Sequence, residues 1–339
     1  MHSHHFDIGP EAPEGDPHAP RLVRDDAANG RVLCGSSLFR RVRAPLWDVE
    51  ARLREMDAAG VSHQVISPVP VVMEHAGRTA DPGFARTVNS SLAAACQRSG
   101  GRLLGLGCLP ALPGEEALAT VEECRALGLR GVEVGTTVSG LDLDDPRLRP
   151  LWRECERTDS AVFVHPVDGG RKVVRRPGGP YDLGLGMTTD TALAATALVF
   201  GGVLREHPRL RVALAHGGGT FAAAYPRLRT AAALHGGAPE EHDALVRRLW
   251  VDSLVFDEEL LGPLQHRFGP DRLLLGSDEP FFPDQLRRSR RDLVSATGRG
   301  LLSGDPLVAN ALEFLGLPVP PAAPGPGVPA PRARPSGAL

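Results

Sequence analysis

The sequence predicts a (β/α)₈ barrel, a closed parallel α/β fold, and two observations carry that prediction. From about residue 61 to 280, short apolar runs rich in β-branched residues alternate with helix-length amphipathic stretches. Repeated strand–helix units with continuously apolar strands are typical of a parallel sheet covered on both faces. Polar residues follow the ends of three predicted strands, at His165, His216 and Asp278. The active site of such a barrel lies at the carboxyl ends of its strands. The position of these polar residues therefore favours a barrel over the alternative, an open doubly wound sheet.

Seven strands are predicted in this region, and one more at the N-terminus would complete eight. They are Ser62–Val69, Arg102–Leu109, Gly128–Gly135, Ala161–His165, Arg211–Ala215, Leu249–Leu254 and Arg272–Gly276. The predicted helices are Asp48–Ala59, Asp81–Arg98, Glu115–Leu127, Pro146–Thr158, Thr189–Glu206 and Asp257–Phe268. The first of them has Asp48 as its cap and Gly60 as its stop. We expect one barrel domain over residues 1–317, followed by a disordered tail, 318–339, which is rich in Pro, Ala and Gly.

The composition excludes several classes of protein. The 339 residues are 42% hydrophobic and 23% charged, which suits one folded barrel and not a disordered chain. A net charge of −3 provides no basic surface, so neither nucleic acid nor an anionic membrane is expected as a partner. No apolar run approaches the roughly 18 residues of a membrane span, and no signal-peptide core is found. The five cysteines lack C-x-x-C spacing, so we expect a soluble, cytoplasmic protein with reduced thiols.

Four sequence signals together indicate a metal site. In His2-Ser3-His4, residues i and i+2 of a strand point to one face, so both imidazoles can bind one metal. His165 ends an apolar run, and His216 opens a His-Gly-Gly-Gly segment whose glycines allow close approach. Asp278 follows the last strand. Each signal alone also fits a frayed terminus, a polar strand end, a glycine turn or a helix cap. Their order along successive strand ends predicts one site for Zn²⁺ or another first-row divalent metal.

The same motifs, in this order, resemble a known family. The sequence is similar to the aminocarboxymuconate-semialdehyde decarboxylases and their relatives in the amidohydrolase superfamily. The resemblance spans nearly the whole chain outside the tail, with matches at His2-Ser3-His4, Phe39-Arg40, Arg54-Glu55-Met56-Asp57, Gly105-Leu106-Gly107, Phe163-Val164-His165-Pro166, Ala215-His216-Gly217-Gly218-Gly219, Leu275-Gly276-Ser277-Asp278 and Asn310 to Gly316. It implies a barrel of the metal-dependent hydrolase type and an enzyme of the carboxy-lyase class. The substrate would be a small conjugated or aromatic carboxylic acid, such as 2-amino-3-carboxymuconate-6-semialdehyde, decarboxylated without oxidation or an organic cofactor.

The resemblance also implies roles for individual residues. One divalent metal ion, Zn²⁺ first and Mn²⁺ as the alternative, would be bound by His2, His4, His165 and Asp278. His216 would act as acid and base beside a water on the metal, and Asp278 would share in catalysis. Arg40 would bind a substrate carboxylate, and Phe281 would stack on the substrate. Arg227 would reach into the neighbouring site of a homodimer, although an arginine without such a match is more often a solvated surface charge.

Three positions depart from the family pattern. Only Met1 precedes His2, where the family has an apolar strand with an aspartate, so the two N-terminal ligands are expected to be less firmly held. Cys34 stands where the family has a lysine. The loop after His165 is more basic and less aromatic than the family's loop, which carries Trp and Met. The last two differences leave the metal chemistry intact and point to a substrate outside the family's usual one, such as an aromatic acid of secondary metabolism.

Two further functions fit the same residues. Metal-dependent hydrolysis of a small lactone or amide would use the same site, and release of CO₂ against ring opening distinguishes the two reactions. A non-catalytic binding protein that has lost its metal would be recognised by its metal content. Two-metal members of the superfamily commonly bridge their metals with a carboxylated lysine on the fourth strand. The fourth strand here, Gly128–Gly135, has no lysine, so we expect one metal per chain.

Overall fold

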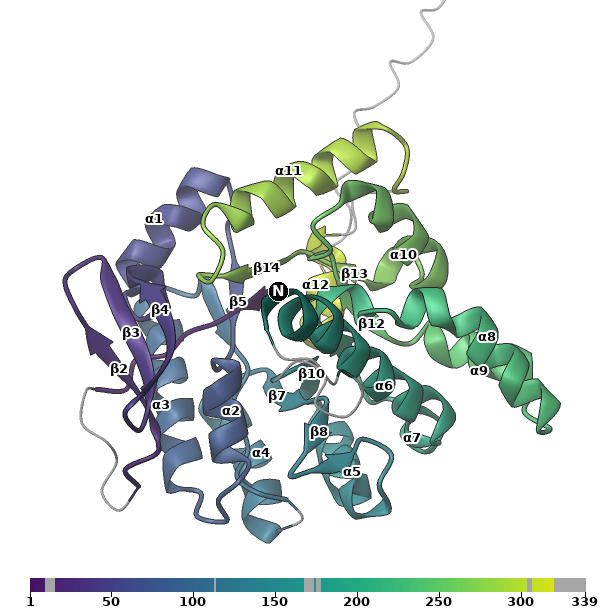
Figure 1. Cartoon of the computed structure of the whole chain (residues 1–339), viewed down its shortest axis with the longest axis horizontal. Coiled ribbons are helices and arrows are strands. Elements are labelled where there is room, and N and C mark those ends of the chain that lie inside the picture. The colour runs from purple at the N-terminus through teal and green to yellow at the C-terminus, as the bar shows by residue number, and fades with distance from the viewer. Residues whose placement is uncertain (10–15, 113, 168–173, 175–177, 304–306, 320–339) are drawn as a thin grey trace, which may run out of the picture.

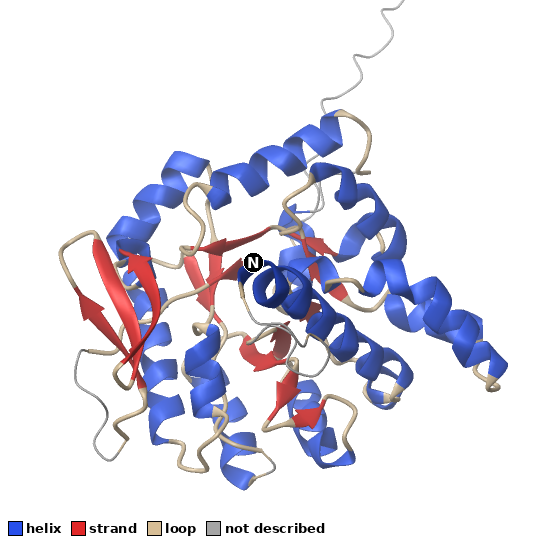
Figure 2. Ribbon diagram, in the orientation of Figure 1, coloured by secondary structure: helices blue, strands red, loops and turns tan. Residues whose placement is uncertain are grey.

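Parallel strands form a ring that is surrounded by helices (Figures 1 and 2). The computed structural model describes residues 1–9, 16–112, 114–167, 174, 178–303 and 307–319. The strands of the ring are β1 (His2–Ser3), β5 (Gln64–Ile66), β6 (Leu103–Gly105), β7 (Gly131–Gly135), β10 (Ala161–His165), β11 (Val212–Leu214) and β12 (Trp250–Asp252), with an eighth strand split into β13 (Leu273–Leu274) and β14 (Gly276–Glu279). Their hydrogen-bonded parts are shorter than most of the predicted strands, whose end residues curve into the loops.

Hydrogen bonds close this ring on all sides. Strands β7, β10, β11, β12 and β13 are consecutive neighbours in one sheet, and β14 pairs in parallel with β1. Ser67 N donates to Ser3 O at 2.9 Å and so joins β1 to β5. Strand β5 pairs with β6, and Gly107 N donates to Gly131 O at 2.9 Å to join β6 to β7. The structure is therefore the predicted barrel, and the open sheet is wrong.

The helices around the ring begin and end close to the predicted residues in most cases. They are α1 (Val49–Ala59), α2 (Pro70–Ala76), α3 (Gly83–Arg98), α4 (Glu115–Ala126), α5 (Arg149–Arg157), α6 (Met187–Phe200), α7 (Val203–Glu206), α8 (Phe221–Leu234), α9 (Pro239–Val246), α10 (Leu261–Phe268), α11 (Gln285–Gly298) and α12 (Leu307–Phe314). The Asp48 side chain caps α1 by accepting from Ala51 N at 3.0 Å, and Gly60 ends the helix with a φ of 67°. Both capping residues were predicted from the sequence.

The predicted helix Thr189–Glu206 ends at the predicted residue, but it starts two residues earlier, at Met187, and is interrupted after Phe200. It is preceded by a π-helical turn, Pro180–Gly186, and it breaks between α6 and α7 because Gly202 adopts a φ of 87°. The combined helical stretch Pro180–Phe200 has 21 residues and a mean hydropathy of 1.3, enough by length and composition to cross a membrane. It packs on the barrel through α6, and one such helix is weak support for a membrane segment because core helices pass the same test.

An antiparallel sheet that was not predicted lies between β1 and α1 in the chain. Its strands are β2 (Pro20–Arg24), β3 (Asn29–Cys34) and β4 (Ser37–Arg43), and it stands beside the ring at the left of Figure 1. A smaller antiparallel hairpin, β8 (Thr137–Val138) with β9 (Leu141–Asp142), follows β7. The three-stranded sheet matters for function, because its last strand carries Phe39 and Arg40.

The interior of the barrel is apolar at one end and polar at the other. At the apolar end, Phe163 and Trp250 belong to one buried cluster with Phe314. Phe314 is the last residue of α12, which lies against this end of the barrel. Side chains alternate along a strand, so His165 shares the inward face of β10 with Phe163, two residues nearer the carboxyl end. The histidines therefore lie at the carboxyl end of the barrel, where such folds place their sites. The predicted tail, 318–339, falls outside the described residues from 320 onward and stays a prediction.

Candidate metal centre

The four predicted metal ligands converge on one point. One potential ligand atom from each of His2, His4, His165 and Asp278 lies within 4.8 Å of the others, and all four residues are buried. The ring of His165 is 4.8 Å from that of His2 and 5.1 Å from that of His4, centroid to centroid. Residues far apart in the sequence thus meet because β1 lies between β14 and β5 in the ring. The short strand β1 and the residue after it place both N-terminal histidines at this point, and the expectation that they are less firmly held stays a prediction.

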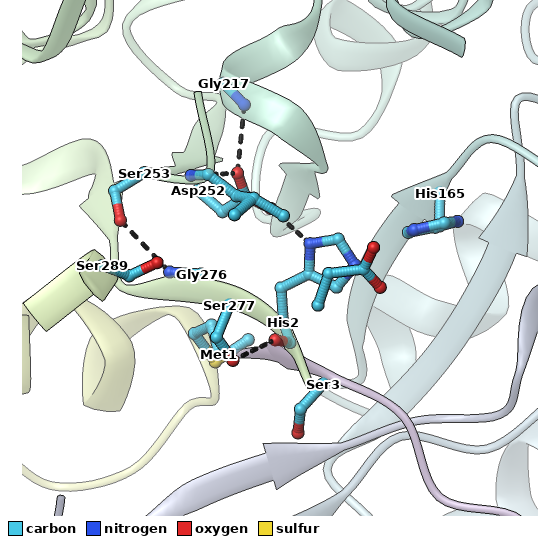
Figure 3. A network of polar contacts seen from close by, with 12 residues as sticks. Met1, His2, Ser3, His165, Gly217, Asp252, Ser253, Gly276, Ser277 and Ser289 are labelled. Carbon is cyan, nitrogen blue, oxygen red and sulfur yellow. Dashed lines mark hydrogen bonds and ion pairs between the residues drawn. The ribbon is translucent and has the colours of Figure 1, made fainter. Parts of the chain in front are cut away.

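The Nδ1 atoms of the three histidines face away from this point, toward hydrogen-bond acceptors. His2 Nδ1 lies 2.6 Å from the Asp252 carboxylate, as Figure 3 shows. His4 Nδ1 lies 2.7 Å from Pro68 O, and His165 Nδ1 lies 2.6 Å from Pro166 O. Carbonyl and carboxylate oxygens only accept, so each imidazole carries its proton on Nδ1 and directs the lone pair of Nε2 into the centre. Histidine ligands of metals are commonly oriented by such acceptors.

The atoms that face the centre have no hydrogen-bond partner among the described residues. They are the Nε2 atoms of the three histidines and Oδ1 of Asp278, all buried. His4 Nε2 and Asp278 Oδ1 lie 3.0 Å apart, yet with the proton of His4 on Nδ1 both atoms offer lone pairs. Buried polar atoms without partners are costly, and a cation between these four would satisfy them together. The residues present therefore fit a divalent metal ion with nitrogen and oxygen ligands.

His216 lies beside the four residues and is not one of them. Its ring is 5.2 Å from that of His2 and 5.1 Å from that of His165, and its buried Nδ1 has no partner among described residues. Burial lowers the pKa of His216 below its usual 6.5, so its neutral form is favoured. His216 and Asp278 have φ angles of 55° and 52°, a strained region for residues other than glycine, and such strain clusters at functional sites.

The glycines after His216 are required by the local backbone. Gly219 has a φ of 61°, and a Cβ on it would lie 2.0 Å from Thr188 O. Gly217 N donates to Asp252 Oδ1 at 3.0 Å (Figure 3). The predicted close approach at His-Gly-Gly-Gly is present, and it joins this turn both to α6 and to the carboxylate that orients His2.

Asp252 is a functional residue that the sequence interpretation missed. It is buried at the end of β12, where it accepts from His2 through one oxygen and from Gly217 N and Leu254 N through the other. Burial alone raises the pKa of Asp252, but the hydrogen bond and the charge interaction with His2 outweigh it and hold the pKa at about 2. Its position at the end of the apolar run 249–251, like that of His165 at the end of the run 161–164, is the signal that could have found it.

Glu133 is a second buried carboxyl that the sequence interpretation missed. It lies on β7, opposite Phe163 in the register, with both oxygens buried and without a hydrogen-bond partner among described residues. Burial raises the pKa of Glu133 to about 8, so the carboxyl is protonated at neutral pH in the metal-free protein. As predicted, β7 carries no lysine, which leaves no carboxylated lysine to bridge a second metal there.

A cavity of about 1120 Å³ leads from the centre to the surface. His165, His216 and Asp278 form part of its wall, and so do Arg40 and Phe281. The Arg40 guanidinium lies 4.7 Å from the centroid of the Phe281 ring, which in turn lies 5.3 Å from the ring of His4. The structure thus brings two of the three predicted substrate-binding residues to the predicted metal site, although Arg40 lies on β4 and Phe281 in the turn after β14.

Other predicted features lie elsewhere. Arg227 is exposed on α8 and is not among the described residues that line the cavity. Cys34 ends β3, half-buried, and does not contribute to the described wall. Most of the loop after His165, residues 168–173 and 175–177, lies outside the described residues.

The geometry and the sequence both match one family. The family model described as amidohydrolase matches residues 1–303 of the chain. The chain therefore belongs to the amidohydrolase family, as the motifs predicted. Its donor set and its family together indicate a divalent metal.

Relatives within the family narrow the class further. The chain is 34% identical over 306 residues to a 2-amino-3-carboxymuconate-6-semialdehyde decarboxylase from Dictyostelium discoideum, covering 86% of this chain and 83% of that protein. It is 30% identical over 214 residues to a gamma-resorcylate decarboxylase from Rhodococcus jostii, covering 59% and 64%. The crystal structure of IDCase from Metarhizium anisopliae in apo form matches with a TM-score of 0.73 and 25% identity, covering 93% and 96%. The two curated relatives are decarboxylases, which agrees with the carboxy-lyase class predicted from the sequence.

Proposed function

We propose that this protein is a metal-dependent, non-oxidative decarboxylase of a small aromatic or conjugated carboxylic acid. One observation carries the proposal. Four buried ligand atoms without other partners lie within 4.8 Å of one another, and two of the four residues, His165 and Asp278, line a cavity that Arg40 also lines. A cation site next to an arginine is suited to a substrate with two adjacent anionic or polar oxygen groups, such as a carboxylate beside a hydroxyl.

The reaction breaks the bond between the carboxylate carbon and the ring or conjugated carbon. The electron pair stays on that carbon, CO₂ leaves, and a proton takes its place. A divalent metal held by His2, His4, His165 and Asp278 supplies Lewis-acid stabilisation of the negative charge that develops. The conjugated system of the substrate delocalises the electron pair, so no organic cofactor is required.

The residues of the chain divide the remaining tasks. Arg40 binds the substrate carboxylate or a neighbouring anionic group, and Phe281, held between Arg40 and His4, stacks against the ring. His216 transfers the proton. Its low pKa and its unpartnered Nδ1 support that role, because a neutral imidazole can first accept a proton and then return it to carbon.

Zn²⁺ is the first candidate for the metal and Mn²⁺ the second. Imidazole nitrogens and a carboxylate oxygen are ligands that suit Zn²⁺, and the same set also suits manganese. The absence of a lysine from β7 supports one metal per chain.

We further propose that the active unit is a homodimer in which Arg227 acts in trans. Arg227 is exposed on α8, which with α9 extends away from the barrel at the right of Figure 1. A two-fold interface would place this arm against a second copy of the chain, where a guanidinium can bind a carboxylate of the substrate. The five cysteines of the described chain are free thiols, which supports the expected cytoplasmic location.

The test is release of labelled CO₂ from aromatic acids with a labelled carboxyl group. The metal-loaded protein is expected to release CO₂ from a 2-hydroxybenzoate, while the His216→Asn variant with the same metal content is expected to release at least about a hundredfold less. Ring opening of a lactone or hydrolysis of an amide without CO₂ release would instead support a hydrolase on the same site.

A further inference from the structure

We propose that the substrate is an aromatic acid that carries an apolar substituent, and that this substituent binds on an apolar rim at the mouth of the cavity. The rim consists of Phe256, Leu260 and Phe282. The inference rests on the proposed function, because it concerns the substrate of the same site. It assigns a specificity role to three residues for which the metal chemistry has no use.

The rim residues are exposed to a degree that is unusual for large apolar side chains. Phe256 is 60% exposed, Leu260 48% and Phe282 37%. The two aromatic rings pack edge to face, with centroids 5.3 Å apart and an interplanar angle of 71°. Exposed apolar side chains that gather at one place mark a surface that contacts a ligand or partner.

The backbone at Phe256 is held in a strained conformation. Its φ is 58°, in the left-handed region that a bulky aromatic residue rarely adopts. The exposed ring gains little from burial against its own chain, so folding alone does not account for this strain. Strained residues of this kind are found at ligand-binding positions, and here the strain presents the ring at the mouth of the cavity.

The rim is continuous with the candidate active site. All three residues line the same cavity as His165, His216 and Asp278. Phe282 directly follows Phe281, whose ring lies between Arg40 and His4. A substrate bound at the metal centre can therefore extend to the rim within one cavity, and for this reason the rim is assigned to a substituent of the substrate.

The size of the cavity agrees with a substrate larger than one substituted benzene ring. Sites for small molecules have volumes of roughly 300–1,000 Å³. This cavity, at about 1120 Å³, lies above that range, and a hydroxybenzoate at the metal centre would leave much of it empty. Because the rim is apolar, an alkyl chain or a second hydrophobic ring would be favoured there over a charged or sugar substituent.

The experiment uses 2-hydroxy-6-alkylbenzoic acids with alkyl chains of one to seven carbons and the metal-loaded protein. We expect kcat/KM for CO₂ release to rise about two- to fourfold per added methylene until the chain passes the rim, the upper value being that of full burial. Phe256→Ser and Phe282→Ser should flatten this dependence on chain length. Val294→Ser removes an apolar side chain that is also 60% exposed, on α11 and outside the described wall of the cavity, and should leave the dependence unchanged.

The dependence on chain length is a ratio within one preparation, so a variant that is partly unfolded lowers all rates alike and leaves that ratio unchanged. A wild-type protein that decarboxylates short and long acids equally well would overturn the inference and leave the proposed function standing. A protein that decarboxylates none of the acids contradicts the proposed function, and calorimetric binding of the same acids then decides on the rim. An affinity that rises with chain length in the wild type but not in Phe256→Ser supports the role of the rim. An affinity that does not change with chain length in the wild type overturns that role.

Discussion

Replacing Asp252 with asparagine should weaken metal binding while the fold is preserved. Asp252 accepts two backbone N–H groups through one oxygen, which an asparagine oxygen can still accept. Its other oxygen lies 2.6 Å from Nδ1 of His2, and in Asp252→Asn an amide nitrogen takes that place. Two donors would then face each other. The conflict is relieved if His2 moves its proton to Nε2, the atom that faces the metal centre.

The magnitude follows from what is lost. The variant keeps all four metal ligands. It should lose only the hydrogen bond that orients the imidazole of His2. Removing such a supporting group costs about 10- to 100-fold in metal affinity, which corresponds to ~1.4–2.7 kcal/mol. We expect elemental analysis to give about one divalent metal per chain in the wild type. Competition with a chelator of known affinity then measures the metal Kd of both proteins.

A matched control separates this effect from a general loss of charge. Asp243→Asn makes the same change on α9, at a carboxylate that accepts from Tyr225 and Arg229 and lies outside the described cavity wall. It should leave the metal Kd unchanged. Thermal unfolding with chelator present checks that Asp252→Asn is folded. If a folded Asp252→Asn binds metal as tightly as the wild type, the argument from the His2 tautomer is wrong.

The remaining predictions concern the roles of single residues. His216→Asn should keep its metal and lose about a hundredfold or more in turnover, whereas Asp278→Ala should lose the metal; loss of metal from His216→Asn would make it a ligand. Burial raises the pKa of Glu133 to about 8 from 4.5, so the folded protein binds the carboxyl proton more tightly than the unfolded chain does. The contribution of this proton to the free energy of unfolding is full below pH 4.5 and is lost as the pH rises toward 8. Across that window, the free energy of unfolding of the metal-free wild type should therefore fall relative to that of Glu133→Gln, by at most about 1.4 kcal/mol per pH unit. If denaturant unfolding gives the same difference between the two proteins at pH 5 and at pH 8, this prediction is refuted. Mixing inactive His216→Ala and Arg227→Ala chains should restore about one quarter of wild-type sites, and no recovery after demonstrated subunit exchange would exclude Arg227 acting in trans.

The sequence predicted the features that depend on pattern and order. The alternation of apolar strands with helices indicated the barrel, and the polar residues after the strands indicated His165, His216 and Asp278. The H-x-H motif indicated that His2 and His4 share one face. These inferences succeed because the side-chain period of a strand and the common edge of parallel strands follow from local geometry.

The features that were missed depend on contacts between distant segments. Nothing near Asp252 in the sequence shows that its carboxylate meets His2, a residue 250 positions away, since this contact exists only once the ring is closed. The sheet β2–β4 was not predicted because its strands mix polar, charged and apolar residues, and at most every second residue of β2 and β3 is buried. Its position beside the barrel brings Arg40 to the cavity, a placement that was inferred only from the family resemblance.

The most direct test of the account joins metal content to the release of CO₂. A 2-hydroxybenzoate with a labelled carboxyl group is incubated in deuterated water with metal-free protein, and Zn²⁺ or Mn²⁺ is then added in steps. We expect no labelled CO₂ without metal and a rate that rises until about one equivalent is bound. We also expect one deuteron on the carbon that lost the carboxylate for each CO₂ released. Release of CO₂ that is independent of metal, or turnover of lactones by a protein that releases no CO₂ from any aromatic acid, would contradict these expectations.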